Sequence, residues 1–223
     1  MRLLSTKILD LNFKSKIAQI GISIFEYPFI KINSIPLKNF KFQSSFIFSS
    51  QNAVKIAFEN PQIKKQIEGK RYFCVGEKTK ALLEKNGQKV IKMTHNASDL
   101  GFHIIKTYKN ETFSFFCGKL RRPEIESLLA QEKISLQIHE IYNTIYNSKK
   151  FDNQFDGVLF FSPSAVNSFF KKNNWSSKVH AFSIGKSTSK TLEKFTRDFT
   201  EAKKPNENEL LSILNSHYLK YYA

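Results

Sequence analysis

Cysteine is scarce in this sequence. Two cysteines, Cys74 and Cys117, occur in 223 residues, and each lies in an apolar run that is typical of a strand. A disulfide framework or a zinc site needs more ligands at closer spacing. We therefore predict two buried free thiols in a reducing compartment.

Long hydrophobic runs are absent. No apolar run approaches the 18 residues that a membrane-spanning helix needs, so we expect no membrane span. The first ten residues are interrupted by Arg2, Lys7 and Asp10, which is unlike a secretory signal. These two absences predict a cytoplasmic protein.

Acidic residues are few: 19 Asp and Glu stand against 35 Lys and Arg, for a net charge of +16. Such a charge favours an anionic partner, which could be nucleic acid, an acidic membrane or a poly-anionic small molecule. It is equally consistent with lysines that simply cover solvated faces. The basic residues are scattered and no nucleic-acid-binding motif is present, so a nucleic-acid partner is disfavoured.

Glycine-rich phosphate loops and metal-binding patterns are also missing. The sequence contains neither a GxGxxG motif nor a P-loop, which disfavours nucleotide binding. The histidines show no metal-ligand spacing, and we expect them at the surface or at sheet edges. They are His95, His103, His139, His180 and His217.

Apolar residues make up 41% of the chain, 22 of them phenylalanine, which is enough for a sizeable core. Two stretches, 159–166 and 182–190, each read as a buried strand, a tight loop and the start of a helix. Ser162 before Pro163 is typical of a helix N-terminus. In the second stretch, a glycine forms the turn and Ser187 or Thr188 could cap the helix.

The same pattern occurs earlier, at 46–54 and 72–82. Ser50 aligns with Ser162, and the Gly76-to-Gly185 distance (185 − 76 = 109 positions) equals the distance from Thr79 to Thr188. A shared offset indicates two copies of one α/β unit. We therefore expect two domains that face each other across a cleft.

Strand-like and helix-like segments alternate along most of the chain, which predicts mainly parallel sheets with helices on both faces. Expected strands lie near 2–6, 22–27, 45–49, 71–75, 88–92, 113–117, 134–139, 157–161, 179–184 and 197–201. Expected helices lie near 9–19, 51–58, 78–86, 97–108, 122–132, 164–172, 187–195 and 206–219.

The segment after Asp156 has too few strands for a complete sheet, and the N-terminal strands would complete it. The predicted fold is therefore α/β, with two similar parallel-sheet, three-layer domains joined by a two-stranded linker. The first domain is discontinuous and comprises 1–28 and 148–223. The second, inserted domain is 35–138, and the linker is 29–34 with 139–147.

Seven short motifs, in this order and spacing, give the chain its resemblance to a known family. They are Ser5-Thr6-Lys7, 48–54 (FSSQNAV), 75–82 (VGEKTKAL), 118–122 (GKLRR), 141–144 (IYNT), 161–166 (FSPSAV) and 184–189 (IGKSTS). On these motifs the sequence resembles the uroporphyrinogen-III synthase family almost from end to end. It departs from the family at Cys117 and Lys7, where an arginine is expected.

The resemblance implies that the active site lies in a cleft between two α/β domains. It also implies a substrate, hydroxymethylbilane, which is a linear tetrapyrrole carrying many carboxylates. The family closes this chain with inversion of ring D and loss of water, giving uroporphyrinogen III, without cofactor or metal. We expect a monomer that binds neither nucleic acid nor membranes.

The candidate site residues follow the strands, because ligands of parallel α/β sheets bind at the carboxyl ends of strands. Hydroxyls and helix-start N–H groups suit carboxylates. Tyr142 could assist departure of the substrate hydroxyl, or it could simply pack. The expected substrate-binding residues are Thr6, Lys7, Ser50, Thr79, Arg122, Ser162, Ser187 and Thr188. For the hydroxyl residues the alternative is helix capping, and for the basic residues a solvated surface position.

Two other function classes stay open from the sequence. One is a non-catalytic, two-domain α/β module that binds a small anionic ligand. The other is a nucleic-acid binder, suggested by the net charge alone. An assay with hydroxymethylbilane that separates isomers I and III of the product would discriminate among them.

Overall fold

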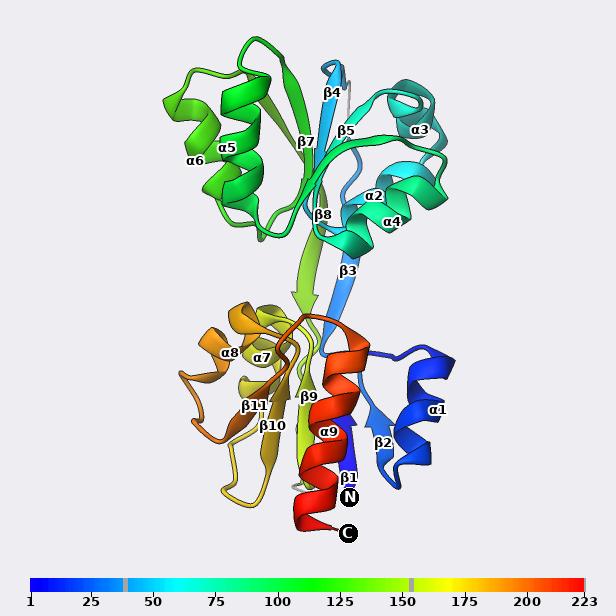
Figure 1. Cartoon of the computed structure of the whole chain (residues 1–223), viewed down its shortest axis with the longest axis vertical. Helices are drawn as coiled ribbons and strands as arrows, with labels where there is room; N and C mark the ends of the chain where they lie inside the picture. The colour runs from blue at the N-terminus through cyan, green and yellow to red at the C-terminus, as the bar shows by residue number, and fades with distance from the viewer. Residues whose placement is uncertain (38–39, 153–154, 223) are drawn as a thin grey trace. The chain divides into compact units, whose positions relative to one another are not determined.

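The computed structural model describes residues 1–37, 40–152 and 155–222. The chain divides into two compact units, one of 1–31 with 145–223 and the other of 32–144. In the first unit, strands from the two ends of the chain lie in one sheet, where the blue β1 is next to the yellow-green β9 (Figure 1).

The first unit contains a five-stranded sheet in the order β11-β10-β9-β1-β2, with every neighbouring pair parallel. The strands are β1 (Arg2–Ser5), β2 (Ser23–Glu26), β9 (Gly157–Phe160), β10 (His180–Ser183) and β11 (Phe199–Glu201). The helices are α1 (Leu11–Gln19), α7 (Pro163–Phe170), α8 (Lys186–Leu192) and α9 (Glu207–Tyr221). Helices α1 and α9 pack on one face of the sheet, and α7 and α8 on the other.

The second unit contains a six-stranded sheet in the order β3-β8-β7-β4-β5-β6, parallel from β8 to β6. Its strands are β3 (Ile30–Ser34), β4 (Ser45–Phe48), β5 (Arg71–Val75), β6 (Val90–Thr94), β7 (Phe113–Gly118) and β8 (Leu136–Tyr146). Its helices are α2 (Gln51–Glu59), α3 (Pro61–Ile67), α4 (Glu77–Lys85), α5 (Ala97–Thr107) and α6 (Glu124–Gln131). Helices α2, α3 and α4 cover one face, and α5 and α6 the other. The predicted α/β class with parallel sheets is confirmed.

The two sheets share one strand order but differ in how the chain enters it. Strands β4, β5 and β6 occupy the places of β9, β10 and β11, and β7 and β8 occupy those of β1 and β2. In the second unit the β7–α6–β8 segment comes last, whereas in the first its counterpart β1–α1–β2 comes from the N-terminus. The two sheets are therefore circular permutations of one topology, which explains why the first unit is discontinuous.

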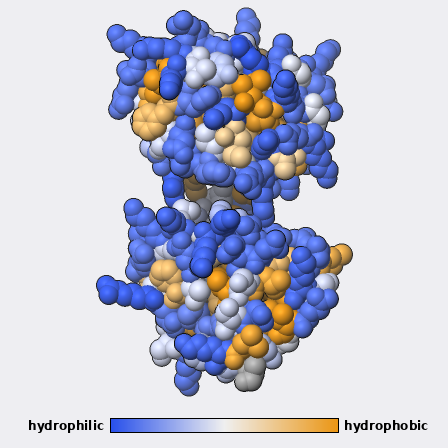
Figure 2. Space-filling model, viewed as in Figure 1, coloured by the Kyte–Doolittle hydropathy of each residue, from blue (hydrophilic) through white to orange (hydrophobic). Residues whose placement is uncertain are grey.

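Strand residues are buried on both faces of each sheet. In β4, Phe46 and Phe48 pack toward α2 and α4, while Ile47 between them packs toward α5 and α6. The Phe48 ring stacks on Phe116 of β7 at 5.2 Å between centroids. Removing one such buried ring typically costs about 3–5 kcal/mol. Outside these cores, hydrophilic residues cover most of the visible surface of each unit (Figure 2).

Three local predictions were wrong or incomplete. Helix α3 was not predicted, although Asn60 caps it and Pro61 is its first residue. The expected strand 134–139 and the extended segment after it form one strand, β8. Neither Ser187 nor Thr188 caps α8, because the N-cap residue is Gly185 and both residues belong to the first turn of the helix.

Strands β3 and β8 both run across the boundary between the two units. They are neighbours in the sheet, and the Ile35 N–H donates to the Ile141 carbonyl at 2.8 Å. Farther along, the Asn147 N–H donates to the Phe29 carbonyl at 2.8 Å, which makes the pairing antiparallel. A separate linker at 29–34 and 139–147 stays a prediction.

His139 on β8 is buried, which corrects the expectation of a surface or edge histidine. Its ring contacts Phe116 and Phe42, which also contact each other, and its Nε2 is 3.2 Å from Ser114 Oγ. Ser114 Oγ already accepts the Gln43 N–H, so its own proton is available for Nε2 of a neutral imidazole. Burial lowers the pKa of His139 to about 4.

The buried histidine makes stability dependent on pH. Between its unfolded pKa of 6.5 and its folded pKa of about 4, the unfolded chain binds a proton that the folded chain excludes. Stability should therefore be complete above pH 6.5 and fall as the pH drops toward 4, by about 3 kcal/mol. Urea unfolding at pH 7.5 and 4.5 measures this, and His139→Gln should remove most of the difference. An unchanged pH dependence in that variant would contradict the assignment.

Candidate active site

The parallel strands bring several predicted residues to one edge of each sheet. In the second unit, Ser50 follows β4, Thr79 lies just after β5, and Arg122 follows β7. In the first unit, Thr6 and Lys7 follow β1, Ser162 follows β9, and Ser187 and Thr188 follow β10. Because neighbouring strands run in the same direction, each of these two groups lies at the carboxyl edge of its own sheet.

Tyr142 and Ser50 are in direct contact. The phenol of Tyr142, on β8, donates a hydrogen bond to Ser50 Oγ at 3.0 Å. Ser50 is the N-cap residue of α2, and the same Oγ accepts the Asn52 N–H at 3.1 Å. Since Ser50 Oγ accepts from both partners, its own proton is not used in either bond. Two sequence candidates thus form one hydrogen-bonded pair.

Gly118, the last residue of β7, makes room for the Tyr142 ring. A Cβ atom at position 118 would lie 2.6 Å from Cε2 and Cζ of Tyr142 and 2.9 Å from its hydroxyl. The backbone N–H of the next residue, Lys119, donates to the Tyr142 carbonyl at 2.9 Å. The end of β7 therefore holds both the ring and the main chain of Tyr142.

The pairing of β7 with β8 shifts at this point. Cys117 pairs with Glu140, but Gly118 pairs with Tyr142, so Ile141 is one extra residue on β8. Such a bulge changes the direction in which the following side chain points, and bulges are common beside active sites. In regular pairing Gly118 would face the apolar Ile141 instead of the phenol.

Burial raises the pKa of Tyr142 above its ordinary value of 10, with the Ser50 hydrogen bond acting against that rise. The phenol is therefore protonated at physiological pH and can serve as a hydrogen-bond donor. Burial also raises the pKa of Cys74 and Cys117 to about 12. Both cysteines are free and buried, as predicted, and neither is a ready nucleophile.

Thr79 and Thr188 occupy matching places, each in the first turn of its helix and three residues after a glycine N-cap. Both are buried, and neither hydroxyl has a hydrogen-bond partner among the described residues. Among the described residues, the side-chain nitrogen and oxygen atoms that are fully enclosed and lack a hydrogen-bond partner belong to Glu124 and Trp175. The two threonine oxygens are therefore not fully enclosed. These two hydroxyls can therefore bind a ligand without breaking an internal bond.

Gly76 and Gly185, the N-caps of α4 and α8, have no side chain to cap the first turn. Gly76 has φ of +88°, a backbone conformation that favours glycine. The first N–H groups of an uncapped helix suit an anion. The turn before α8 is braced by buried hydroxyls that sequence reasoning missed: Ser189 Oγ donates to Ser183 Oγ at 2.9 Å.

Other predicted residues are already engaged. Thr6 Oγ1 donates to the Leu159 carbonyl at 2.7 Å, so its proton ties β1 to β9. Lys7 Nζ lies 3.9 Å from Glu207 Oε1 and 4.3 Å from the centre of the Phe161 ring. Ser162 caps α7 by accepting the Ala165 N–H at 3.2 Å, as predicted from the sequence.

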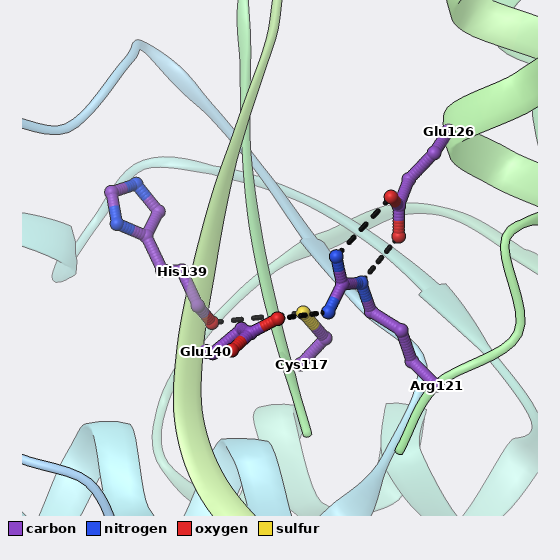
Figure 3. A network of polar contacts seen from close by, with 5 residues as sticks. All are labelled: Cys117, Arg121, Glu126, His139 and Glu140. Carbon is purple, nitrogen blue, oxygen red and sulfur yellow. Dashed lines mark hydrogen bonds and ion pairs between the residues drawn. The ribbon is translucent and has the colours of Figure 1, made fainter. Parts of the chain in front are cut away.

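Arg122 has no ion-pair partner among the described residues, whereas Arg121 beside it is anchored. The Arg121 guanidinium bonds Glu126 of α6 and Glu140 of β8 (Figure 3). Hydrogen bonding to Glu126 raises the pKa of Arg121, which stays charged. Sequence reasoning did not select Arg121, because nothing in the local pattern separates it from Arg122.

A small cavity lies in the first unit, on the side of α7. Phe151, Phe155 and Trp175 line it, and none of the predicted site residues does. Within the described ranges, no cluster of three or more His, Cys, Asp or Glu side chains could hold a metal. The absence of a cofactor stays a prediction.

Residues 12–212 match the sequence model of one family, described as uroporphyrinogen-III synthase HemD. The chain belongs to the uroporphyrinogen-III synthase family. This match covers most of the chain and confirms the predicted function in tetrapyrrole biosynthesis, as a lyase that cyclises its substrate.

Solved structures of synthases agree with the fold. The uroporphyrinogen-III synthetase from Helicobacter pylori is 17% identical, with a TM-score of 0.72 over 97% of this chain and 100% of that one. A mutant synthase from Thermus thermophilus is 12% identical, with a TM-score of 0.68 over 99% of each chain. A search of curated proteins gave no match. Among the residues with described placement, no helix is both long and apolar enough to cross a bilayer.

Gly118→Ala tests whether the close approach of β7 holds the phenol in place. The added Cβ overlaps the Tyr142 ring and should push the hydroxyl away from Ser50, lowering kcat for the synthase reaction about 10-fold or more. Turnover and thermal unfolding are measured together. The control is Gly101→Ala, whose Cβ overlaps Leu128 at 2.7 Å elsewhere in the same unit. It should lower stability and leave kcat unchanged, and equal kcat losses in both variants would contradict the prediction.

Proposed function

We propose that Tyr142 is the catalytic residue of the cyclisation and that the carboxyl-edge loops of the two units bind the substrate carboxylates. The observation that supports this most directly is the hydrogen bond between the Tyr142 phenol and Ser50 Oγ. It places a neutral donor of raised pKa beside the start of a helix, within the set of loops where parallel α/β sheets bind ligands.

The proposed reaction begins with breakage of the C–O bond of the hydroxymethyl group on ring A. A donor gives its proton to the departing hydroxyl, which leaves as water, and the ring becomes a cationic azafulvene. The substituted carbon of ring D attacks this cation to form a spiro intermediate. The bond that joined ring D to ring C then breaks, ring D re-closes through its other carbon, and a proton is lost.

Tyr142 assists the first step. At rest its proton points to Ser50 Oγ, whose own proton is unused. When the substrate hydroxyl arrives, the phenol proton turns toward it, and Ser50 can rotate its hydroxyl to donate to the phenol oxygen. The phenol gives its proton to the departing hydroxyl as the C–O bond breaks, and the Ser50 hydroxyl bonds the phenolate oxygen that remains. The proton lost on ring closure restores the phenol.

The carboxylates are held by main-chain N–H groups at helix starts and by hydroxyls. Thr79 and Thr188 have unused hydroxyls at uncapped helices, and Ser187 is exposed beside Thr188. Arg122 lies in the loop after β7, and Lys7 lies in the loop after β1. The net charge of +16 attracts a poly-anion and speeds its capture.

The remaining roles are also proposals. Ser50 and Ser162 bind substrate in addition to capping α2 and α7, and Thr6 contributes through its position after β1. We also propose a cytoplasmic monomer that uses no cofactor or metal and binds neither nucleic acid nor membranes. Incubation with hydroxymethylbilane and separation of isomers I and III tests the function, since formation of isomer I at the spontaneous rate would favour a non-catalytic binding module.

Tyr142→Phe removes the phenol oxygen and keeps the ring in its place over Gly118. We expect kcat for isomer III to fall about 100-fold, because the departing hydroxyl loses its donor. Single Ser or Thr to Ala changes in the four loops should each cost less than this. Rates are measured at saturating substrate with both isomers quantified, and a Tyr142→Phe rate equal to wild type would remove Tyr142 from the mechanism.

Thr79→Val and Thr188→Val replace each hydroxyl by a methyl group of similar shape. Loss of one hydrogen bond to a carboxylate should raise KM about 10-fold while kcat stays near wild type. Thr6→Val is the comparison, because the hydroxyl of Thr6 bonds the Leu159 carbonyl, and its loss should lower stability more than it raises KM. Unchanged KM in both Thr79→Val and Thr188→Val would exclude these hydroxyls from substrate binding.

A further inference from the structure

Arg121 lies in the loop after β7 and connects three elements of the second unit. Its guanidinium makes a two-point contact with Glu126 of α6, through Nε to Oε1 and Nη2 to Oε2, the latter at 3.2 Å. Its Nη1 donates to Glu140 Oε1 on β8 (Figure 3). The loop is thus tied to both a helix and a strand.

The strand contact lies at the β8 bulge. Glu140 pairs with Cys117 and is the last residue in regular register, Ile141 is the extra residue, and Tyr142 follows it. The Cys117 thiol lies 3.7 Å from the carbonyl of His139, the residue before Glu140 on β8. The carbonyl of Ile141 accepts the Ile35 N–H on the opposite side of the strand.

A bulge needs such ties because a strand can slip toward regular pairing. Here regular pairing would place Ile141 opposite Gly118 and would turn the phenol away from Ser50. Among the described residues, two contacts join the loop after β7 to the strand residues on either side of the bulge. Arg121 bonds Glu140, which precedes the extra residue, and the Lys119 N–H donates to the carbonyl of Tyr142, which follows it. Arg121 is the one of these two that acts through a side chain.

We propose that Arg121 is a positioning residue: held by Glu126, it fixes Glu140 and thereby the bulge that aims the Tyr142 phenol at Ser50. This inference rests on the catalytic role proposed for Tyr142. A bidentate arginine–carboxylate contact fixes direction as well as distance, which a lysine cannot do. The side chains of Arg121 and Glu126 are 20% and 21% exposed and their contact is bidentate, so the pair also contributes to stability. The effect on geometry is distinguished from that contribution by comparing kcat with thermal unfolding.

A double-mutant cycle tests the proposal. Arg121→Gln should lower kcat for isomer III about 10-fold in the otherwise unchanged chain and less than about 2-fold in the Tyr142→Phe background. A residue that acts only through the phenol loses its effect when the phenol is gone. Glu140→Gln should reproduce the pattern of Arg121→Gln, because it removes the same contact from the other side.

Arg71→Gln is the matched control. Arg71 forms an ion pair with Glu111 in the same unit, so Arg71→Gln makes the same change in charge and also breaks an arginine–glutamate pair. Arg71 begins β5 and therefore lies at the opposite edge of the sheet from Tyr142. The Arg71→Gln variant should keep the wild-type kcat. Thermal unfolding of every variant checks folding, and Arg121→Lys, which keeps the charge without the two-point contact, replaces Arg121→Gln if that variant does not fold.

Each outcome has one reading. A wild-type kcat in Arg121→Gln, an equal loss in both backgrounds, or an equal loss in Arg71→Gln overturns the positioning role. Tyr142→Phe with wild-type turnover overturns the catalytic role of Tyr142 and the inference built on it. If Tyr142→Phe lowers kcat and Arg121→Gln lowers it by the same factor with or without the phenol, the proposed function stands and the positioning role alone is rejected.

Discussion

The common direction of neighbouring strands is the constraint on which the candidate site depends. In the second unit, β4, β5, β7 and β8 all point the same way, so the residues that follow them collect at one edge. Helices cover both faces of the sheet, which leaves that edge as the place where hydroxyls and helix-start N–H groups can meet a ligand. Ser50 and Tyr142 are 92 positions apart in the chain and become hydrogen-bond partners only through this arrangement.

The bulge in β8 adds a second requirement. Parallel pairing alone would set an isoleucine against Gly118, and the one-residue shift sets a phenol there instead. Glycine is needed at 118 because any Cβ would overlap the ring. A departure from regular structure and a residue without a side chain thus occur together at the candidate catalytic group, where strained or irregular backbone is commonly retained.

The circular relation between the two sheets explains why the hydroxyl residues come in pairs. Ser50 and Ser162 cap helices after equivalent strands, and Thr79 and Thr188 follow equivalent glycines. The phenol at the β8 bulge belongs to the second unit only. Two copies of one fold therefore provide similar carboxyl edges, where we propose that carboxylates bind, while the proposed proton donor is found in one of them.

Sequence reasoning predicted most elements because buried parallel strands and amphipathic helices leave clear apolar patterns. It missed α3, whose signal was the short Asn60-Pro61 start, and it divided β8 because half-buried strands alternate less clearly. It also placed His139 at the surface or a sheet edge, since a neutral imidazole packed against two aromatic rings leaves no pattern in the chain.

The amino-acid sequence by itself determined the α/β class, the duplicated strand–loop–helix pattern and the residues that follow each strand, because local periodicity and capping preferences set these. Only the tertiary structure decided which candidates meet. It joined Tyr142 to Ser50, tied the hydroxyl of Thr6 to β9 and selected Arg121 over Arg122 as the anchored arginine. Such choices depend on strand register and on contacts between distant segments, which no local pattern of residues encodes.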